Sequence, residues 1–317
     1  MIMSKGKVLI CDRVHEHLTE GLKGLGYEVD YQPEVMLDDV ANQISNLTGI
    51  VINSRTVLMK ELLERADKLR FIARLGSGME IVDVPYAASK GIVCISAPEG
   101  NARSVAEQAL AAMLSWMNNL AVADRFLRSG QWERERFRGR TCAETQLGII
   151  GYGHTGRALA QSASSLGISV LAYDKYHNDF NDGFAISSGL SELLATCQVV
   201  SLHLPLTEET VGYLNSDFFA QVKPGTMLMN TSRGAMMHLD DTLKALDEKH
   251  IDFLYCDVLP HEGKSFLEAV NRKNFNRFIK HSRVAVSPHV AGWTTESFVK
   301  LSEVLLSKIQ EATKKEF

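Results

Sequence analysis

Short apolar runs alternate with amphipathic segments along the chain. In the first hundred residues the apolar runs that predict strands are 8–11, 50–53, 71–75 and 92–95. The segments between them, 15–25, 59–66 and 84–89, have apolar residues at the spacing typical of helices. Strands that alternate with helices in this way are typical of a parallel sheet with crossover helices.

A second series of the same kind begins after a long apolar segment. Residues 101–128 predict one long helix, with Asn101 or Ser104 as its cap, and a polar connection follows over 129–145. The next predicted strands are 147–150, 170–173, 199–202, 227–230, 254–257 and 284–287, before a last helix over 294–312. The pattern therefore predicts an α/β protein with two doubly wound parallel-sheet domains.

Composition excludes several classes of protein but does not identify the function. The 317 residues exceed what one hydrophobic core usually serves, and the hydrophobic share of 45% and the charged share of 23% are those of folded proteins. A formal net charge of −4 disfavours a nucleic-acid partner. Charged residues interrupt 106–127, which disfavours a membrane span, and five scattered cysteines favour reduced thiols in a cytoplasmic protein. No cluster has metal-ligand spacing.

A glycine-rich loop carries the first chemical signal. Gly151, Gly153 and Gly156 follow the predicted strand 146–150 and open a helical run over 157–166. The next strand ends on Asp174, about the distance expected of an acid that binds the adenosine ribose. Such a unit binds a dinucleotide pyrophosphate at the start of the helix, and the carboxylate favours NAD over NADP. The alternative is a structural glycine turn.

Three ionisable residues stand at the carboxyl ends of later strands, where ligands bind in open α/β sheets. They are Arg233, Glu262 and His289. Histidine titrates near neutrality and can act as a general acid or base, a carboxylate can orient it, and arginine can bind a substrate carboxylate. Taken singly, Arg233 could pair with a surface acid, Glu262 could be solvated and His289 could bond a neighbouring carbonyl.

The ordered motifs resemble those of the D-isomer-specific 2-hydroxyacid dehydrogenase family, including its phosphoglycerate dehydrogenase-like and glyoxylate-hydroxypyruvate reductase-like members. The matching segments are 74–78, 101–107, the glycine loop with Asp174, 203–207, 230–234, 257–262 and 288–292. The resemblance implies a Rossmann NAD-binding domain over 101–290, inserted into a flavodoxin-like substrate domain made of 1–100 and 291–317.

The same resemblance implies roles for individual residues. His289 is implied as the general acid/base, Glu262 as its partner and Arg233 as the group that binds the substrate. The implied cofactor positions are Gly151, Gly153, His154, Thr155, Gly156, Asp174, His203, Leu204, Pro205, Thr231, Ser232, Asp257, Ala291 and Gly292. The implied substrate positions are Asn53, Gly76, Ser77 and Gly78.

Two positions depart from the family pattern. Gly263 follows Glu262 where the family commonly has proline, before a longer basic stretch over 264–280. Asn53 stands where many members carry an arginine that assists substrate binding in phosphoglycerate-type enzymes, and Arg55 is a candidate to replace it. The second departure disfavours a phosphorylated substrate.

These observations predict an NAD-dependent enzyme that interconverts a small D-2-hydroxyacid and a 2-oxoacid. The alternative from another class is an NAD(H)-sensing binding protein of the co-repressor type, which this fold also resembles. Formate oxidation is disfavoured, because that branch has glutamine beside its histidine. The resemblance also implies a homodimer, with the 101–128 helix and Gln131-Trp132 as the predicted contact.

Overall fold

The computed structural model describes residues 4–177, 179–180 and 182–314. The chain divides into two compact units. The first runs from the beginning of the chain to Asn101 and resumes at Trp293, and the second is the continuous segment Ala102–Gly292. The second unit is therefore inserted into the first, and each unit is built around its own parallel sheet.

The first unit contains a five-stranded sheet in the order β2-β1-β3-β4-β5, the flavodoxin-like order. Its strands are β1 (Lys7–Ile10), β2 (Glu28–Tyr31), β3 (Leu47–Ile52), β4 (Phe71–Arg74) and β5 (Val93–Ser96). Its helices are α1 (Glu16–Gly24), α2 (Leu37–Gln43), α3 (Lys60–Leu63), α4 (Val84–Ser89) and α13 (Thr295–Lys314), with a 3-10 turn at Ile44–Asn46.

Alternate residues of these strands face two separate cores. On one face Val8 and Ile10 pack in a cluster with Leu301, Leu305 and Ile309 of α13. On the other face Leu9, Ile50 and Ile52 join residues from α2, α3 and α4. Because both faces are covered, β1, β3 and β4 are continuous apolar runs, which is why the sequence pattern predicted them.

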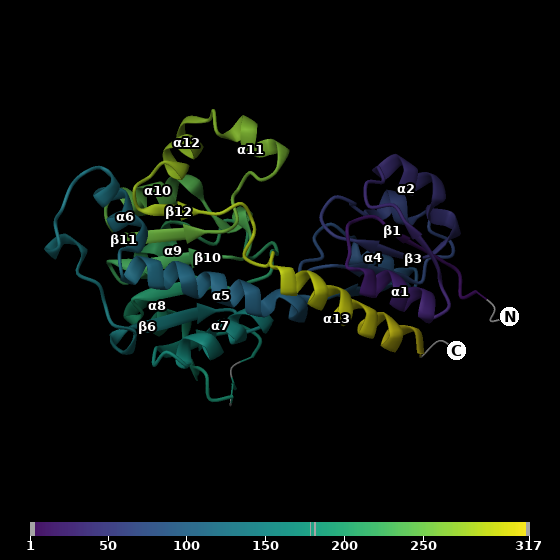
Figure 1. Ribbon diagram of the computed structural model, residues 1–317, viewed down its shortest axis with the longest axis horizontal. Helices are drawn as coiled ribbons and strands as arrows, with labels where there is room; N and C mark the ends of the chain where they lie inside the picture. Colours follow the sequence, from purple (N-terminus) through teal and green to yellow (C-terminus); the bar gives the residue numbers. More distant parts are fainter. Residues whose placement is uncertain (1–3, 178, 181, 315–317) are drawn as a thin grey trace. The chain divides into compact units, whose positions relative to one another are not determined.

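The second unit contains a seven-stranded parallel sheet in the order β12-β11-β10-β9-β6-β7-β8. Four of these strands, β6, β10, β11 and β12, are labelled in Figure 1. Its strands are β6 (Gln146–Ile150), β7 (Ser169–Tyr173), β8 (Ile186–Ser187), β9 (Val199–Leu202), β10 (Thr226–Asn230), β11 (Ile251–Cys256) and β12 (Val284–Val286). Counted within the unit, this is the doubly wound 3-2-1-4-5-6 order with a seventh strand added. The two predicted parallel-sheet domains are thus confirmed.

Helices cover both faces of this sheet. The helices that follow the first unit are α5 (Pro98–Met117), α6 (Leu120–Arg128), α7 (His154–Ser164), α8 (Leu190–Thr196), α9 (Ser216–Gln221), α10 (Leu239–Asp247), α11 (Lys264–Ala269) and α12 (Lys273–Ile279), and of these α6 has no buried residue. Short 3-10 turns lie at Glu135–Phe137, Cys142–Glu144 and Gly234–Met236. Buried residues of α5 and α7 pack on one face of the sheet, and those of α8, α9, α10 and α12 pack on the other.

The predicted single helix over 101–128 is wrong. The chain forms α5, which starts at Pro98, and then α6, and the two are separated by Asn119 in the left-handed conformation with φ 55°. The proposed caps Asn101 and Ser104 consequently lie inside α5. Asparagine tolerates the left-handed region better than most residues, so it can end one helix and begin another. Among the described residues, none of the helices combines the length and apolarity that a bilayer crossing requires.

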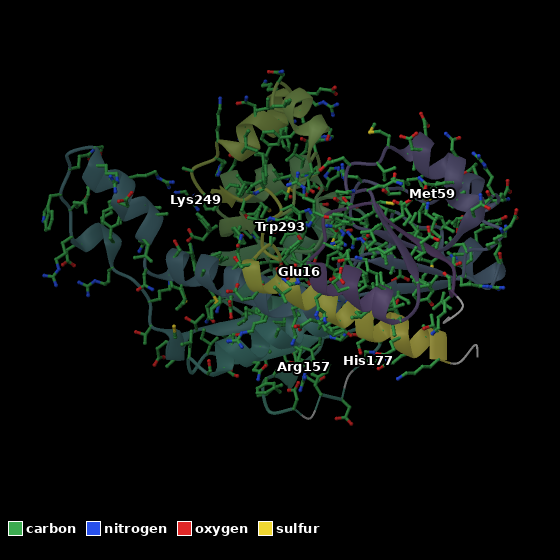
Figure 2. The ribbon with its side chains drawn as sticks, turned by 45° about the vertical axis from the view of Figure 1, so that its right-hand side comes forward. Glu16, Met59, Arg157, His177, Lys249 and Trp293 are labelled. Carbon is green, nitrogen blue, oxygen red and sulfur yellow. The ribbon has the colours of Figure 1, made fainter. Side chains whose placement is uncertain are left out.

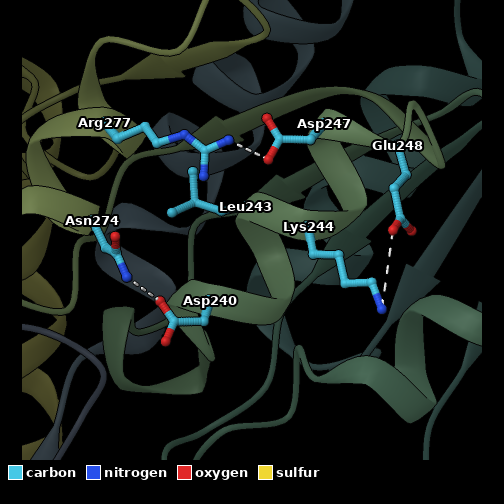
Figure 3. Close-up of a pocket in the computed structure, with 7 residues that line it drawn as sticks. All are labelled: Asp240, Leu243, Lys244, Asp247, Glu248, Asn274 and Arg277. Atoms are coloured by element: carbon cyan, nitrogen blue, oxygen red, sulfur yellow. Dashed lines mark hydrogen bonds and ion pairs between the residues drawn. The ribbon is translucent and has the colours of Figure 1, made fainter.

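The basic stretch after Glu262 forms α11 and α12 of the second unit. Phe275 and Phe278 of α12 are buried in the core. Asn274 donates a hydrogen bond of 2.7 Å to Asp240 of α10, and Arg277 forms an ion pair with Asp247. A shallow polar pocket lies between the two helices (Figure 3), and its lining is Asp240, Leu243, Lys244, Asp247, Glu248, Asn274 and Arg277.

Candidate active site in the second unit

The glycine turn after β6 is fixed by close backbone contacts. Gly151 has φ +93°, and a Cβ placed there would lie 2.4 Å from the carbonyl oxygen of His203. A Cβ on Gly156 would lie 2.1 Å from the carbonyl oxygen of Gly151. On Gly153, by contrast, a Cβ would meet no atom of the described residues within 4 Å. The turn is therefore packed on its inner side and open at Gly153, directly before α7.

Asp174 fixes the loop that follows β7 against the glycine turn. Its Oδ2 accepts the backbone N–H of Tyr152 at 2.8 Å. Its Oδ1 accepts the N–H groups of Tyr176 and His177 at 2.9 and 3.1 Å. His177 on this loop and Arg157 on α7 are both labelled in Figure 2. A carboxylate thus stands beside the glycine turn, as the βαβ pattern predicts.

His203 connects the end of β9 to α7. Its Nε2 lies 2.9 Å from Oγ of Ser201, and its Nδ1 lies 3.1 Å from Oγ1 of Thr155. Burial of the ring lowers the pKa of His203 to about 4, so the imidazole is neutral at physiological pH. Leu204 donates its N–H to Oγ of Ser232 at 3.0 Å, and the exposed Pro205 follows. The neutral ring of His203 therefore links β9 to the start of α7.

Arg233 is presented by a turn that the side chain of Asn230 organises. Oδ1 of Asn230 accepts the Ser232 N–H at 3.0 Å, and its Nδ2 donates to the carbonyl of Arg233 at 3.1 Å. A Cβ on Gly234 would lie only 1.9 Å from the carbonyl oxygen of Leu259. This approach brings the Arg233 turn against the segment that leads to Glu262.

His289 and Glu262 form a direct pair. Nδ1 of His289 lies 2.8 Å from Oε2 of Glu262, and Oε1 of Glu262 accepts the Leu259 N–H at 2.8 Å. Burial raises the pKa of Glu262, but its hydrogen bonds to His289 and Leu259 outweigh burial and lower the pKa overall. The hydrogen bond to Glu262 raises the pKa of His289 against burial and the charge of Arg233. Because a carboxylate only accepts, Nδ1 carries the proton and Nε2 is left for chemistry.

The backbone of His289 is held in an unusual conformation. Its φ is 57°, in the left-handed region, and its N–H donates to the carbonyl of Asp257 at 2.8 Å. The buried carboxylate of Asp257 accepts the N–H groups of Val290 and Ala291 at 2.9 and 2.8 Å. Asp257 therefore holds the backbone on both sides of the imidazole. Its oxygens are engaged by this loop, which gives it a positioning role beyond the predicted cofactor contact.

Three further residues support this loop, and sequence reasoning missed them. Oγ of Ser287 donates to Asp257 at 2.5 Å, and the hydroxyl of Tyr255 lies 2.8 Å from the same Oγ. Gln108 on α5 donates to the Tyr255 hydroxyl at 2.8 Å. We call Asp257, Glu262, Ser287 and His289 the His289 corner. Of the three supporting residues, only Ser287 could be suspected from the sequence, because it lies two residues before His289.

The second unit has the features that a dinucleotide requires. The start of α7 has no side-chain cap among the described residues, so its N–H groups can face a phosphate at the open side of Gly153. Oγ1 of Thr231 is buried without a hydrogen-bond partner in the described part of the chain. A buried hydroxyl normally has a partner, and Thr231 lies at the end of β10 beside Ser232. The residues present thus fit the predicted NAD.

The predicted substrate positions belong to the first unit. Asn53 lies directly after β3, and its backbone N–H donates to Asp12 at 2.8 Å. Its backbone carbonyl accepts a hydrogen bond from Nε of Arg74 at 3.0 Å. Gly76 follows β4 with φ +146°, and the exposed Ser77 and the partly exposed Gly78 come next. These residues gather at the carboxyl ends of β3 and β4.

Arg55, the candidate to replace an arginine at position 53, has other partners in this structure. Its Nε donates to Asp12 at 3.0 Å and its Nη1 to Glu34 at 3.1 Å, while its Nη2 donates to the carbonyl of Cys11 at 3.0 Å. Two carboxylates therefore neutralise its charge. In the described residues of both units, no group of three His, Cys, Asp or Glu side chains could hold a metal ion.

Comparison with known proteins identifies the second unit. Residues 110–291 match the model described as "D-isomer specific 2-hydroxyacid dehydrogenase, NAD binding domain". This range contains the glycine turn and the His289 corner, and the chain therefore carries an NAD-binding domain.

Individual relatives agree with this assignment. D-3-phosphoglycerate dehydrogenase of Haemophilus influenzae is 33% identical over 297 residues, which cover 93% of this chain and 71% of the relative. The same enzyme of Archaeoglobus fulgidus is 28% identical over 97% of this chain, but the chain spans only 57% of that relative. D-lactate dehydrogenase of Aquifex aeolicus, solved with NAD and lactic acid, shares the fold with a TM-score of 0.80, 24% identity and coverage of 98% and 96%. These relatives are dehydrogenases by name, so they give no support to the co-repressor alternative.

Proposed function

Because the chain belongs to the D-isomer specific 2-hydroxyacid dehydrogenase family, we propose that it moves a hydride between NAD and a small, unphosphorylated D-2-hydroxyacid or 2-oxoacid. The observation that carries this proposal is the 2.8 Å contact between His289 and Glu262, next to Arg233. An imidazole, a carboxylate and a guanidinium at one sheet edge are what reduction of a 2-oxoacid needs.

The cofactor would be held by the carboxyl ends of β6, β7 and β10. The amides at the start of α7 would bind the pyrophosphate outside Gly153, and Asp174 would accept the ribose hydroxyls. Thr231 would donate its unpartnered hydroxyl on the nicotinamide side. When bound, NADH supplies the hydride, and all other steps fall to the side chains of this chain.

His289 would move the proton. In the reducing direction its Nε2–H donates to the substrate oxygen, which becomes a hydroxyl as the carbonyl carbon is reduced. Glu262 accepts from Nδ1 throughout, so it favours the imidazolium before the transfer and fixes the ring orientation. In the oxidising direction the neutral ring removes the proton from the hydroxyl. Reduction should therefore fall, and oxidation should rise, as pH passes upward through the raised pKa of His289.

Arg233 would bind the substrate carboxylate and polarise the carbonyl oxygen. Its guanidinium is bidentate by geometry and permanently charged, which suits a planar carboxylate. For the first unit, the family resemblance implies that the backbone N–H groups of Gly76, Ser77 and Gly78 bind substrate. Asn53 and the neutralised Arg55 disfavour a phosphate on the substrate.

The decisive experiment is a steady-state assay of the full chain with NADH and a panel of 2-oxoacids. The panel should contain glyoxylate, pyruvate, a branched 2-oxoacid, hydroxypyruvate and its 3-phosphate. We expect turnover of at least one unphosphorylated member, and a fall in kcat of roughly 100-fold to 10,000-fold in His289→Asn. Asparagine is the suitable replacement because it tolerates the left-handed φ of residue 289.

His261→Asn is the matched control for this variant. His261 adjoins Glu262 in sequence, but its ring contacts Arg272 and Phe275. Its substitution should leave kcat unchanged. Equal rates in the two variants, or NADH binding without turnover of any panel member, would contradict the proposal.

We also propose that the chain is a homodimer through α6 and the segment after it. No residue of α6 is buried, and its apolar residues Leu120, Val122 and Leu127 are exposed, as is Trp132 at 83%. Light scattering at micromolar concentration should give twice the chain mass. Leu127→Glu combined with Trp132→Glu should give a monomer, whereas a monomeric parent chain would exclude the dimer.

A further inference from the structure

An ion pair crosses the edge of the second unit beside the glycine turn. Lys175 comes directly after Asp174, at the end of β7, and its Nζ lies 2.5 Å from Oε2 of Glu209. Glu209 belongs to the loop that follows β9. In the sheet β6 lies between β7 and β9, and all three strands are parallel. The pair therefore connects the loops on either side of β6, at the edge of the sheet where the glycine turn begins.

Glu209 is presented by a stiff turn. Oγ1 of Thr210 donates to the carbonyl of Pro205 at 2.7 Å and accepts the N–H of Thr207 at 2.8 Å. The N–H groups of Thr210 and Val211 both donate to the carbonyl of Thr207. These bonds define the path of residues 205–211, so the position of Glu209 does not depend on its contact with Lys175 alone.

Lys175 is also restrained on its own loop. Its Nζ lies 5.7 Å from the centre of the Tyr176 ring, within the range of a cation–π contact. A lysine immediately after the ribose-binding acid would otherwise attract a 2'-phosphate, as basic residues do in NADP-binding proteins of this fold. With Glu209 in contact, the charge of Lys175 is neutralised by a carboxylate from a second loop.

We propose that Glu209 is a specificity-determining residue, which excludes the 2'-phosphate of NADP by neutralising Lys175. This inference rests on the cofactor site proposed above. It assigns the preference for NAD to two carboxylates on different loops, Asp174 after β7 and Glu209 after β9, in place of Asp174 alone.

The test is titration of the full chain with NADH and NADPH at low ionic strength, with nicotinamide fluorescence as the measure of binding. In Glu209→Gln, affinity for NADPH should rise about fivefold, the size expected of one exposed charge contact, and affinity for NADH should stay within about twofold. The gain should shrink at about 0.5 M salt, because exposed charges are then screened. Adding Lys175→Met to Glu209→Gln should abolish it.

Glu208→Gln is the matched control, because it removes the same charge from the neighbouring exposed position. Its ratio of NADPH to NADH affinity should stay within about twofold of the parent chain. If both variants change this ratio equally, or neither changes it while NADH still binds, Glu209 has no specific role and the inference is overturned. If the parent chain binds neither nucleotide, the proposed cofactor site fails as well.

Discussion

The glycine turn and the His289 corner lie at the carboxyl edge of the same sheet, but opposite means hold them in place. In the glycine turn the backbone segments touch because side chains are missing, at Gly151 and Gly156. In the His289 corner two carboxylates, Asp257 and Glu262, collect backbone and side-chain donors. The first region should therefore be sensitive to added atoms, and the second to a lost charge or hydrogen bond.

Among variants that leave His289 itself in place, the largest effect should come from Glu262→Gln, which removes charge from the His289 corner with little change of shape. We expect kcat/KM for reduction to fall roughly 100-fold, equivalent to ~2.7 kcal/mol. Because Glu262 raises the pKa of His289, its loss lowers that pKa. The pH at which reduction is half-lost should move down, and the rise of oxidation should begin at lower pH.

Glu268→Gln on α11 makes the same change at an exposed position and should alter neither the rate nor the pH profile. A Glu262→Gln variant with the parent pH profile would show that the pair does not set the proton affinity of His289.

A smaller effect is expected from Gly156→Ala, which adds one carbon to the glycine turn. The new Cβ would overlap the carbonyl of Gly151, so stability should fall by about 2 kcal/mol and NADH binding should weaken. Gly153→Ala has open space instead. It should keep the parent unfolding midpoint while weakening NADH binding about tenfold, or ~1.4 kcal/mol. Equal midpoints for the two variants, measured by thermal unfolding, would refute this account of the turn.

The smallest effect should follow Tyr255→Phe, which removes one hydroxyl from beneath the His289 corner. Gln108 and Ser287 each lose a partner, which should cost about 1 kcal/mol and lower the unfolding midpoint by a few degrees. Tyr176→Phe, at a 77% exposed position, should leave the midpoint unchanged. A Tyr255→Phe variant as stable as the parent would place the support of the loop in Asp257 alone.

The fold could be predicted wherever strands are buried on both faces. Continuous apolar runs marked β1, β3, β6 and β9, whereas the exposed edge strands β2 and β8 carry no such run and were missed. The break at Asn119 was missed for a related reason. Apolar residues continue beyond it at Leu120 and Val122, but they stay exposed on α6, so hydrophobic spacing alone could not reveal the change of helix.

The candidate site was predictable where a motif carries its chemistry, as at Gly151–Gly156 and around His289. Its supporting residues were not. Gln108 is 147 residues from its partner Tyr255, and Tyr255 is 32 residues from Ser287. Such pairs form only when α5, β11 and β12 are folded together. The contacts of Arg55 with Asp12 and Glu34 could not be predicted for the same reason.

The insertion of one unit into the other also sets an order for folding during synthesis. One core of the first unit contains Val8 and Ile10 together with Leu301, Leu305 and Ile309 of α13. On the ribosome, the segment Ala102–Gly292 is synthesised before α13. The second unit can then fold first, while the early strands wait with one apolar face uncovered. Chaperone binding to nascent chains should accordingly persist on the first unit until α13 has emerged.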